Sequence, residues 1–175
     1  MIRRSLENAK LHGRVLYRPI GNAVPTAEGA VQLVMEKTRQ TLRGRKALII
    51  GYGRVGKILA HQLFGMGAKV TVAARKSEDF AWIRAFGYDG LDTTRLQGVI
   101  SDFDLVFNTV PALVLTYSRL AELKKDCLVI DLASKPGGAD FILCKEAAFF
   151  LAKNGDRPCT STRPVVKCLY GLFTH

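Results

Sequence analysis

Two patterns of apolar residues alternate along the middle of the chain. Four short runs rich in Val, Ile and Leu have the continuous apolar character of strands buried on both faces, namely residues 46–50, 68–74, 103–110 and 127–132. A weaker run at residues 88–91 predicts one more strand. Apolar residues at helical spacing fill the intervals, at residues 57–64, 77–86, 92–100, 113–123 and 139–151. Strands and helices that alternate in this way predict an α/β fold built on a doubly wound parallel sheet.

The segment before the first strand predicts one long helix. Pro25 and Thr26 are start signals for a helix, and Glu28 would place negative charge in its first turn. Apolar residues then recur at helical spacing as far as Leu42. We therefore expect a crossover helix over residues 22–43, which delivers the chain from a preceding domain into the sheet.

Three glycines follow the first predicted strand at the spacing G-x-G-x-x-G. Gly51 would allow the sharp exit from the strand, Gly53 would let a dinucleotide pyrophosphate approach the backbone, and Gly56 would let the next helix pack closely on the strand. That helix would turn its unpaired N–H groups and its positive end toward the phosphates. The alternative is a plain strand-to-helix turn. We expect a Rossmann-like NAD(P)-binding domain over residues 44–153, with these cofactor-binding residues in the turn: Gly51, Tyr52, Gly53, Arg54, Val55 and Gly56.

The end of the second predicted strand indicates which dinucleotide is bound. An acidic residue there would hydrogen-bond the 2′-hydroxyl of NAD, whereas an arginine accommodates the 2′-phosphate of NADP. The sequence has Arg75, Lys76 and Ser77 at this point and no acid before Glu78. NADP is therefore expected and NAD is less favoured, unless the two basic residues form only a solvated turn. Ser77 would also cap the following helix, which would turn Trp82, Ile83 and Phe86 inward.

Polar residues also end the fourth and fifth predicted strands. Ligands of open α/β sheets lie beyond the carboxyl ends of the strands. The residues at the end of the fourth strand would therefore line the nicotinamide end of the cofactor crevice; they are Asn108, Thr109, Val110 and Pro111. This set could also do no more than close the strand. Ser134 and Lys135 follow the fifth strand, and Lys135 would either hold a substrate carboxylate or be an ordinary surface lysine.

The positive charge of the chain sits mainly at its two ends. The formal net charge is +11, with ten Lys and Arg against three Asp and Glu in residues 1–46, eleven against ten in 47–140, and five against two in 141–175. Residues 1–21 are an irregular lead-in or the remnant of an N-terminal domain, and residues 154–175 are polar, contain prolines and predict an irregular tail. A nucleic-acid binder usually gathers charge on a recognition element beside aromatics or a known motif, and none is evident, so nucleic-acid binding is not expected.

Composition excludes several further classes of protein. No apolar run approaches the roughly 20 residues that cross a membrane, and the start lacks the apolar segment of a signal peptide, so we expect a cytoplasmic protein with no membrane contact. The four cysteines form no C-x-x-C pair and have no histidines at metal spacing, which predicts reduced thiols and no metal site. The three histidines form no proton-transfer set, so the catalytic residues stay unknown and redox chemistry by a bound cofactor is expected instead of hydrolysis.

Five motifs of the chain resemble those of one enzyme family, the A subunit of dipicolinate synthase from spore-forming bacteria. They are residues 22–30, 51–57, 72–76, 108–112 and 131–138, and the resemblance covers about residues 10–145. It implies NADP-dependent oxidation of a dihydro- or tetrahydrodipicolinate-type heterocyclic dicarboxylate to dipicolinate. It further implies the mother-cell cytoplasm of a sporulating bacterium as the location, and a partner in the form of a separate B subunit, with a homo-oligomer left open.

The family comparison also implies what the chain lacks. The family has a longer N-terminal domain, so we expect most of that domain to be missing here and the sequence to diverge after about Cys144. By analogy with 2-hydroxyacid dehydrogenases and adenosylhomocysteinase, Thr26 and Glu28 would lie near the interdomain cleft. Two alternatives remain: a non-catalytic nucleotide-binding module or inactive truncated remnant, and an NAD(P)-binding domain of the 2-hydroxyacid dehydrogenase or adenosylhomocysteinase type.

Overall fold

A six-stranded parallel sheet organises the part of the chain that the computed structural model describes, which comprises residues 22–133, 138 and 165–168. The strand order is β3-β2-β1-β4-β5-β6. The chain therefore winds outward from the centre twice, once in each direction, and the predicted doubly wound sheet is confirmed. The strands are β1 (Lys46–Ile50), β2 (Lys69–Ala74), β3 (Asp89–Asp92), β4 (Leu105–Asn108), β5 (Leu128–Asp131) and β6 (Val165–Cys168).

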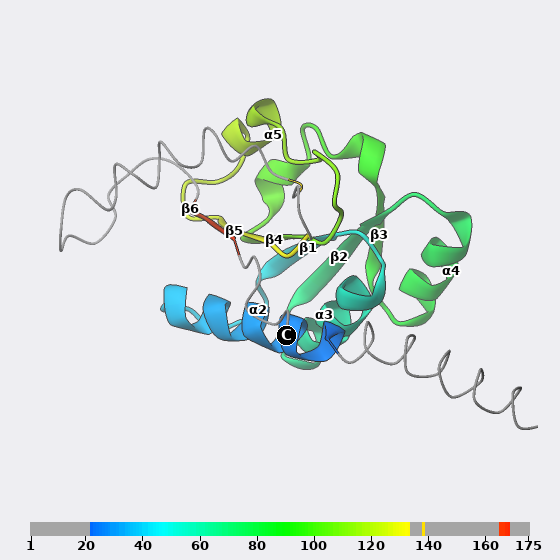
Figure 1. Ribbon diagram of the computed structural model, residues 1–175, viewed down its shortest axis with the longest axis horizontal. Helices are drawn as coiled ribbons and strands as arrows, with labels where there is room; N and C mark the ends of the chain where they lie inside the picture. The colour runs from blue at the N-terminus through cyan, green and yellow to red at the C-terminus, as the bar shows by residue number, and fades with distance from the viewer. Residues whose placement is uncertain (1–21, 134–137, 139–164, 169–175) are drawn as a thin grey trace, which may run out of the picture.

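Helices cover both faces of this sheet. Figure 1 shows α2 and α3 together on one face, with α5 on the other. The helices are α2 (Ala23–Lys37), α3 (Arg54–Gly65), α4 (Ser77–Ala85) and α5 (Tyr117–Ala121), with two short 3-10 helices, η1 (Thr93–Arg95) and η2 (Ile100–Asp102).

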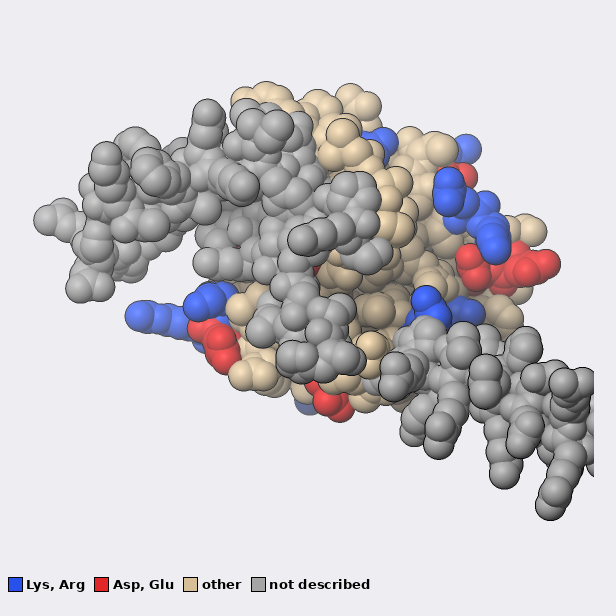
Figure 2. Space-filling view, viewed as in Figure 1, with Lys and Arg blue, Asp and Glu red and all other residues tan. Residues whose placement is uncertain are grey.

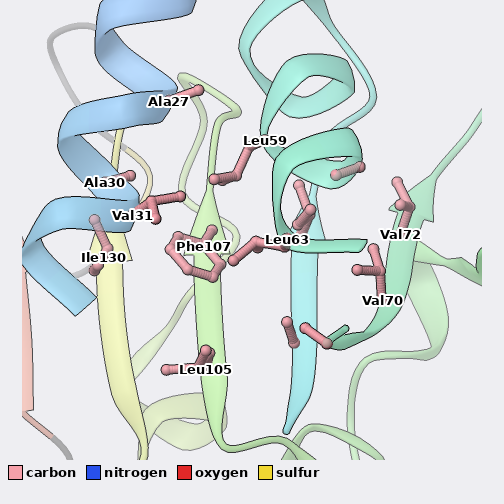
Figure 3. Packing of buried hydrophobic residues seen from close by; sticks show 14 of the residues in the cluster. Ala27, Ala30, Val31, Leu59, Leu63, Val70, Val72, Leu105, Phe107 and Ile130 are labelled. Atoms are coloured by element: carbon pink, nitrogen blue, oxygen red, sulfur yellow. The ribbon is translucent and has the colours of Figure 1, made fainter. Parts of the chain in front are cut away.

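The alternation of side chains along the central strands divides the core into two clusters. In β1, Ala47 and Ile49 face the layer of α2 and α3, while Leu48 and Ile50 face the opposite layer. Figure 3 shows the first cluster, in which side chains of α2 and α3 meet those of the sheet around the fully buried Phe107. Because both faces are covered, the central strands are apolar at nearly every position.

The crossover helix is shorter than the sequence indicates. It ends at Lys37, because Thr38 adopts an extended backbone and both its N–H and its hydroxyl donate to the carbonyl oxygen of Val34, at 2.9 Å each. The helix also begins at Ala23, so Glu28 lies outside the first turn, and the expectation of an acidic first turn was wrong.

Two other segments contain less α-helix than the sequence predicts. The predicted helix at 113–123 shrinks to α5, because the N–H groups of Val114 and Leu115 donate to the carbonyl oxygen of Gly138, at 3.0 and 2.9 Å. The predicted helix at 92–100 is replaced by η1 and the start of η2.

Helix α4 buries a smaller face than its periodicity predicts. Ile83 is fully buried, but Trp82 and Phe86 are 57% and 50% exposed and stack on each other at a centroid distance of 5.8 Å. Spaced four residues apart, these two share one side of the helix, and in this short helix that side does not face the sheet. Ser77 is the first helical residue, follows Lys76 at the N-cap position, and makes no capping bond, so its predicted capping role was wrong.

The expectation of an irregular tail was wrong at residues 165–168. These residues form β6, which pairs in parallel with β5 in the register Leu128↔Val165. The reason is that Val165 and Val166 are β-branched, and β5 offers an edge with which they can pair. The predicted helix at 139–151 and the rest of the predicted tail lie outside the described residues.

Candidate functional site at the carboxyl edge of the sheet

The chain reverses its winding direction between β1 and β4. From β1 it proceeds to β2 and β3 on one side, then returns to β4 and continues to β5 and β6 on the other. At such a switch point the loops after the two central strands diverge and leave a crevice, which is where ligands of this fold class bind. In this chain the two loops on either side of the position where this fold class has its crevice are the glycine turn after β1 and the loop after β4.

The three glycines of the turn have different surroundings. Gly51 has a φ of +99°, and a Cβ placed on it would lie 2.5 Å from Oγ1 of Thr109 and 2.8 Å from Cγ2 of Val110. A Cβ on Gly56 would collide with the carbonyl oxygen of Gly51, so the close approach of helix and turn requires glycine. Gly53 is exposed and a Cβ there would meet nothing within 4 Å. The turn is therefore tightly packed at its first and third glycines and open at the second.

The N-terminus of α3 is left without a side-chain cap. Gly53 is the N-cap residue, it offers no side chain, and the first turn of α3 contains no acidic residue. By contrast, the carboxylate of Asp92 accepts the N–H of Thr94 at the start of η1, at 2.8 Å. The unpaired N–H groups and the dipole of α3 thus make a positive end beside the open glycine, which suits an anionic ligand.

The other residues of the turn contribute in different ways. Tyr52 is 7% exposed, and its side chain belongs to the core. Burial is the main cause that raises the pKa of Tyr52, followed by the nearby Tyr88 and Asp79, so the phenol stays neutral at physiological pH. Val55 packs against the core, whereas Arg54 is exposed at the start of α3.

The basic residues after β2 are available for a ligand. Arg75, Lys76 and Ser77 are all exposed, and within the described part of the chain neither basic side chain forms an ion pair or a hydrogen bond. On the neighbouring strand, Asp92 pairs with Ala74 in the register. Its carboxylate is already bonded by the N–H and the hydroxyl of Thr94, and these bonds lower its pKa.

The loop after β4 closes against the glycine turn. The hydroxyl of Thr109 donates to the carbonyl oxygen of Ile50 at 3.0 Å, and the Thr109 N–H donates to the same oxygen at 2.9 Å. Asn108 is fully buried, Val110 is half-buried and Pro111 is exposed. The predicted residues of this loop are therefore brought next to the glycine turn, although Asn108 has no exposed surface of its own.

The remaining predicted residues lie elsewhere. Glu28 lines a hollow of about 520 Å³ between α2 and the C-terminal part of α3, together with Met66. The hydroxyl of Thr26 donates to the carbonyl oxygen of Asn22, at 2.6 Å. The residues predicted after β5, Ser134 and Lys135, lie outside the described residues.

One residue that shapes the site was given no role by the sequence reasoning. Asp131, at the end of β5, is fully buried and accepts hydrogen bonds from Asn108, from the N–H of Ala133 and from the N–H of Gly138. The available signal was a charged residue ending an apolar strand, since a buried carboxylate needs several donors.

Other kinds of site have little support in the described part of the chain. No group of His, Cys, Asp and Glu side chains there could hold a metal ion, and none of the helices there has the length and apolar character of a membrane span. Cys127 is buried, and burial raises its pKa to about 12. Figure 2 shows acidic and basic side chains next to each other over α4, not one continuous positive surface.

The glycine turn, the uncapped helix and the switch point together define a dinucleotide-binding domain. The chain belongs to the family of the S-adenosyl-L-homocysteine hydrolase NAD-binding domain, whose model matches residues 23–141. More particularly, it is similar to the A subunit of dipicolinate synthase from Bacillus subtilis, with 36% identity over 122 residues that make up 70% of this chain and 41% of that protein.

Two solved structures of dipicolinate synthase agree with this relationship. The A subunit from Bacillus halodurans is 40% identical, with a TM-score of 0.70, over 73% of this chain and 44% of that one. The A subunit from Bacillus subtilis is 30% identical, with a TM-score of 0.72, over 87% and 46%. The chain thus has an NAD(P)-binding domain like that of the dipicolinate synthase A subunit. It spans less than half the length of these relatives.

Proposed function

We propose that this chain binds NADP(H) in preference to NAD(H). The observation that carries the proposal is the pair of unpaired basic side chains, Arg75 and Lys76, at the carboxyl end of β2. On the adjoining strand, the carboxylate of Asp92 is already bonded by Thr94. A 2′-phosphate would find an arginine fork and an ammonium there, with the Ser77 hydroxyl beside them, whereas a 2′-hydroxyl would find no acidic side chain among the three residues that directly follow β2.

The pyrophosphate of the same cofactor fits the glycine turn. The open space at Gly53 lets phosphate oxygens approach the backbone, and the uncapped N-terminus of α3 supplies N–H donors. The nicotinamide half would extend over β4, against Thr109, Val110 and Pro111. Bound in this way, NADP+ would supply the hydride chemistry, while the residues of this chain bind and orient it.

The nucleotide preference is tested by titrating the full chain with NADPH and NADH. Replacing Arg75 with Ala removes a charge-assisted hydrogen bond, so the Kd for NADPH should rise about tenfold while that for NADH stays within about twofold. Lys69→Ala is the matched control, because Lys69 is an exposed basic residue at the other end of β2. Equal affinities for the two nucleotides, or an Arg75→Ala variant that keeps its preference, would contradict the proposal.

For the reaction, we propose hydride transfer from a dihydrodipicolinate-type dicarboxylate to NADP+, with release of one proton and with dipicolinate and NADPH as products. A tetrahydrodipicolinate-type substrate would need two such transfers, to two molecules of NADP+, to reach dipicolinate. The similarity to the dipicolinate synthase A subunit supports this assignment. Ser134 and Lys135 would hold a substrate carboxylate, Thr26 and Glu28 would border the cleft, and a B subunit would be the partner. Formation of NADPH by the purified chain and a B subunit, dependent on the dicarboxylate, is the corresponding assay.

A nucleotide-binding module without catalysis is the second candidate. It is favoured by the matching family model, which describes an NAD-binding domain over residues 23–141. This candidate predicts tight NADPH binding with no turnover in the reconstituted assay, even when the B subunit is present. The two candidates therefore share the binding result and differ in the turnover result.

A further inference from the structure

A buried hydrogen-bond network joins the ends of β4 and β5 behind the crevice. Its centre is the carboxylate of Asp131, which is fully buried. Oδ1 accepts from Nδ2 of Asn108 at 2.9 Å and from the N–H of Ala133 at 3.0 Å, while Oδ2 accepts from the N–H of Gly138 at 2.9 Å. One carboxylate thus connects the loop after β4 with the loop after β5.

The carboxylate determines which way the Asn108 amide points. Both oxygens of Asp131 act as acceptors in these bonds, so Asn108 turns its NH₂ group toward Asp131 and its oxygen away. In that orientation Nδ2 also donates to the carbonyl oxygen of Val110 at 3.0 Å, and Oδ1 accepts the N–H of Val110 at 3.2 Å. The side chain of Asn108 therefore holds both polar backbone groups of Val110.

Val110 and its neighbour Thr109 form the wall of the crevice next to the glycine turn. Their side chains are the atoms that a Cβ on Gly51 would meet, at 2.8 and 2.5 Å. Gly138 links the network to the segment that follows this loop: its N–H donates to Asp131, and its carbonyl oxygen accepts the N–H groups of Val114 and Leu115. The position of this wall thus depends on Asp131 through the bonds of Asn108 to Val110, although Asp131 itself does not reach the surface.

We propose that Asp131 is a positioning residue for the nicotinamide half of the bound dinucleotide, acting through Asn108 on the loop after β4. This inference rests on the dinucleotide binding proposed above. In a doubly wound sheet each half binds one mononucleotide, so the adenosine half lies over β1, β2 and β3, away from the network. The nicotinamide half lies over β4 and β5, where the network sets the loop.

The experiment compares a whole cofactor with its adenosine half in the full chain. Asp131→Asn keeps the shape of the side chain but adds a donor, so the Asn108 amide loses its single orientation. The Kd for NADPH should rise about tenfold, which corresponds to one lost buried hydrogen bond, while the Kd for 2′,5′-ADP should stay within about twofold. Val129→Ala is the matched control, because it creates a cavity in the same strand without touching the network; it should lower stability and leave the ratio of the two Kd values unchanged.

A second variant, Gly138→Ala, tests the same role in case Asp131→Asn fails to fold. In Gly138→Ala the carboxylate stays in place, but the new Cβ would collide with Nδ2 of Asn108 and lie 2.5 Å from the carbonyl oxygen of Val110. It should change the ratio of Kd values in the same direction. The positioning role would be overturned if the Kd values for NADPH and 2′,5′-ADP rose equally, if neither Kd rose, or if both variants failed to fold. Absence of NADPH binding by the unaltered chain would instead overturn the proposed function and this inference with it.

Discussion

Adding one methyl group at Gly53 should separate cofactor binding from folding. Gly53 has φ −80° and ψ −164°, a backbone that alanine adopts without strain, and a Cβ there meets nothing within 4 Å. The free energy of unfolding of Gly53→Ala should therefore stay within about 1 kcal/mol of the unaltered chain. The same methyl group would occupy the space into which the pyrophosphate must approach, so the Kd for NADPH should rise at least about tenfold.

Gly51→Ala is the matched comparison, because it changes the same turn in the opposite way. Its positive φ would cost about 1–3 kcal/mol of backbone strain in any other residue. Overlap of the new Cβ with Thr109 and Val110 would cost about 1–3 kcal/mol more. Gly51→Ala should therefore lower the free energy of unfolding by about 2–6 kcal/mol.

Two measurements on the same samples decide the outcome. Urea unfolding followed by circular dichroism gives the free energy of unfolding, and titration of NADPH followed by its own fluorescence gives the Kd. If Gly53→Ala binds NADPH like the unaltered chain, the pyrophosphate does not approach the backbone there. If Gly53→Ala is as unstable as Gly51→Ala, the open space beside Gly53 is not real and the packing argument fails.

Two further predictions concern the stability of the scaffold. Phe107→Ala should lower the free energy of unfolding by about 3–5 kcal/mol, because the ring is fully buried between the sheet and the helices, and a loss below about 1 kcal/mol in urea unfolding would contradict that packing. For Asp104, burial acts to raise the pKa, but bonds from Lys124 and from the N–H of Lys46 outweigh it, so the pKa lies below its usual value of 3.8. A lowered pKa stabilises the folded state above the usual value and loses this effect as the pH falls through the folded pKa. Asp104→Asn should therefore be less stable than the unaltered chain by about 0.5 kcal/mol at pH 7, since the ion pair is partly exposed. In unfolding measurements this difference should shrink progressively as the pH falls below 3.8, the usual pKa of the group. A difference in stability that does not change with pH would contradict the contribution assigned to Asp104.

The part of the site that lies on one continuous stretch was predictable from the sequence. The strand, the glycine turn and the start of α3 follow one another within residues 46–57, and each depends on its neighbours in the chain. Arg75 and Lys76 were found because they directly follow an apolar strand. Whether these residues bind NADP stays a prediction.

The part of the site that joins distant segments was not predictable. Asp131 looked like the end of a strand, yet it holds Asn108, 23 residues earlier in the chain. The helix expected at 113–123 is cut short by bonds to Gly138, which no local pattern indicates. Tyr52 lies within the predicted cofactor turn, but its ring belongs to the core.

One physical cause explains why some features could be predicted from the sequence and others could not. Strand and helix periodicity, the positive φ of Gly51 and the exposed charges after β2 are properties of neighbouring residues, so the sequence by itself determined the α/β alternation and the location of the glycine turn. The length of α5, the pairing of β6 with β5 and the orientation of the Asn108 amide depend on donors and acceptors that meet only when the sheet assembles. Only the tertiary structure could decide them, because a buried polar group takes the partner that folding brings to it.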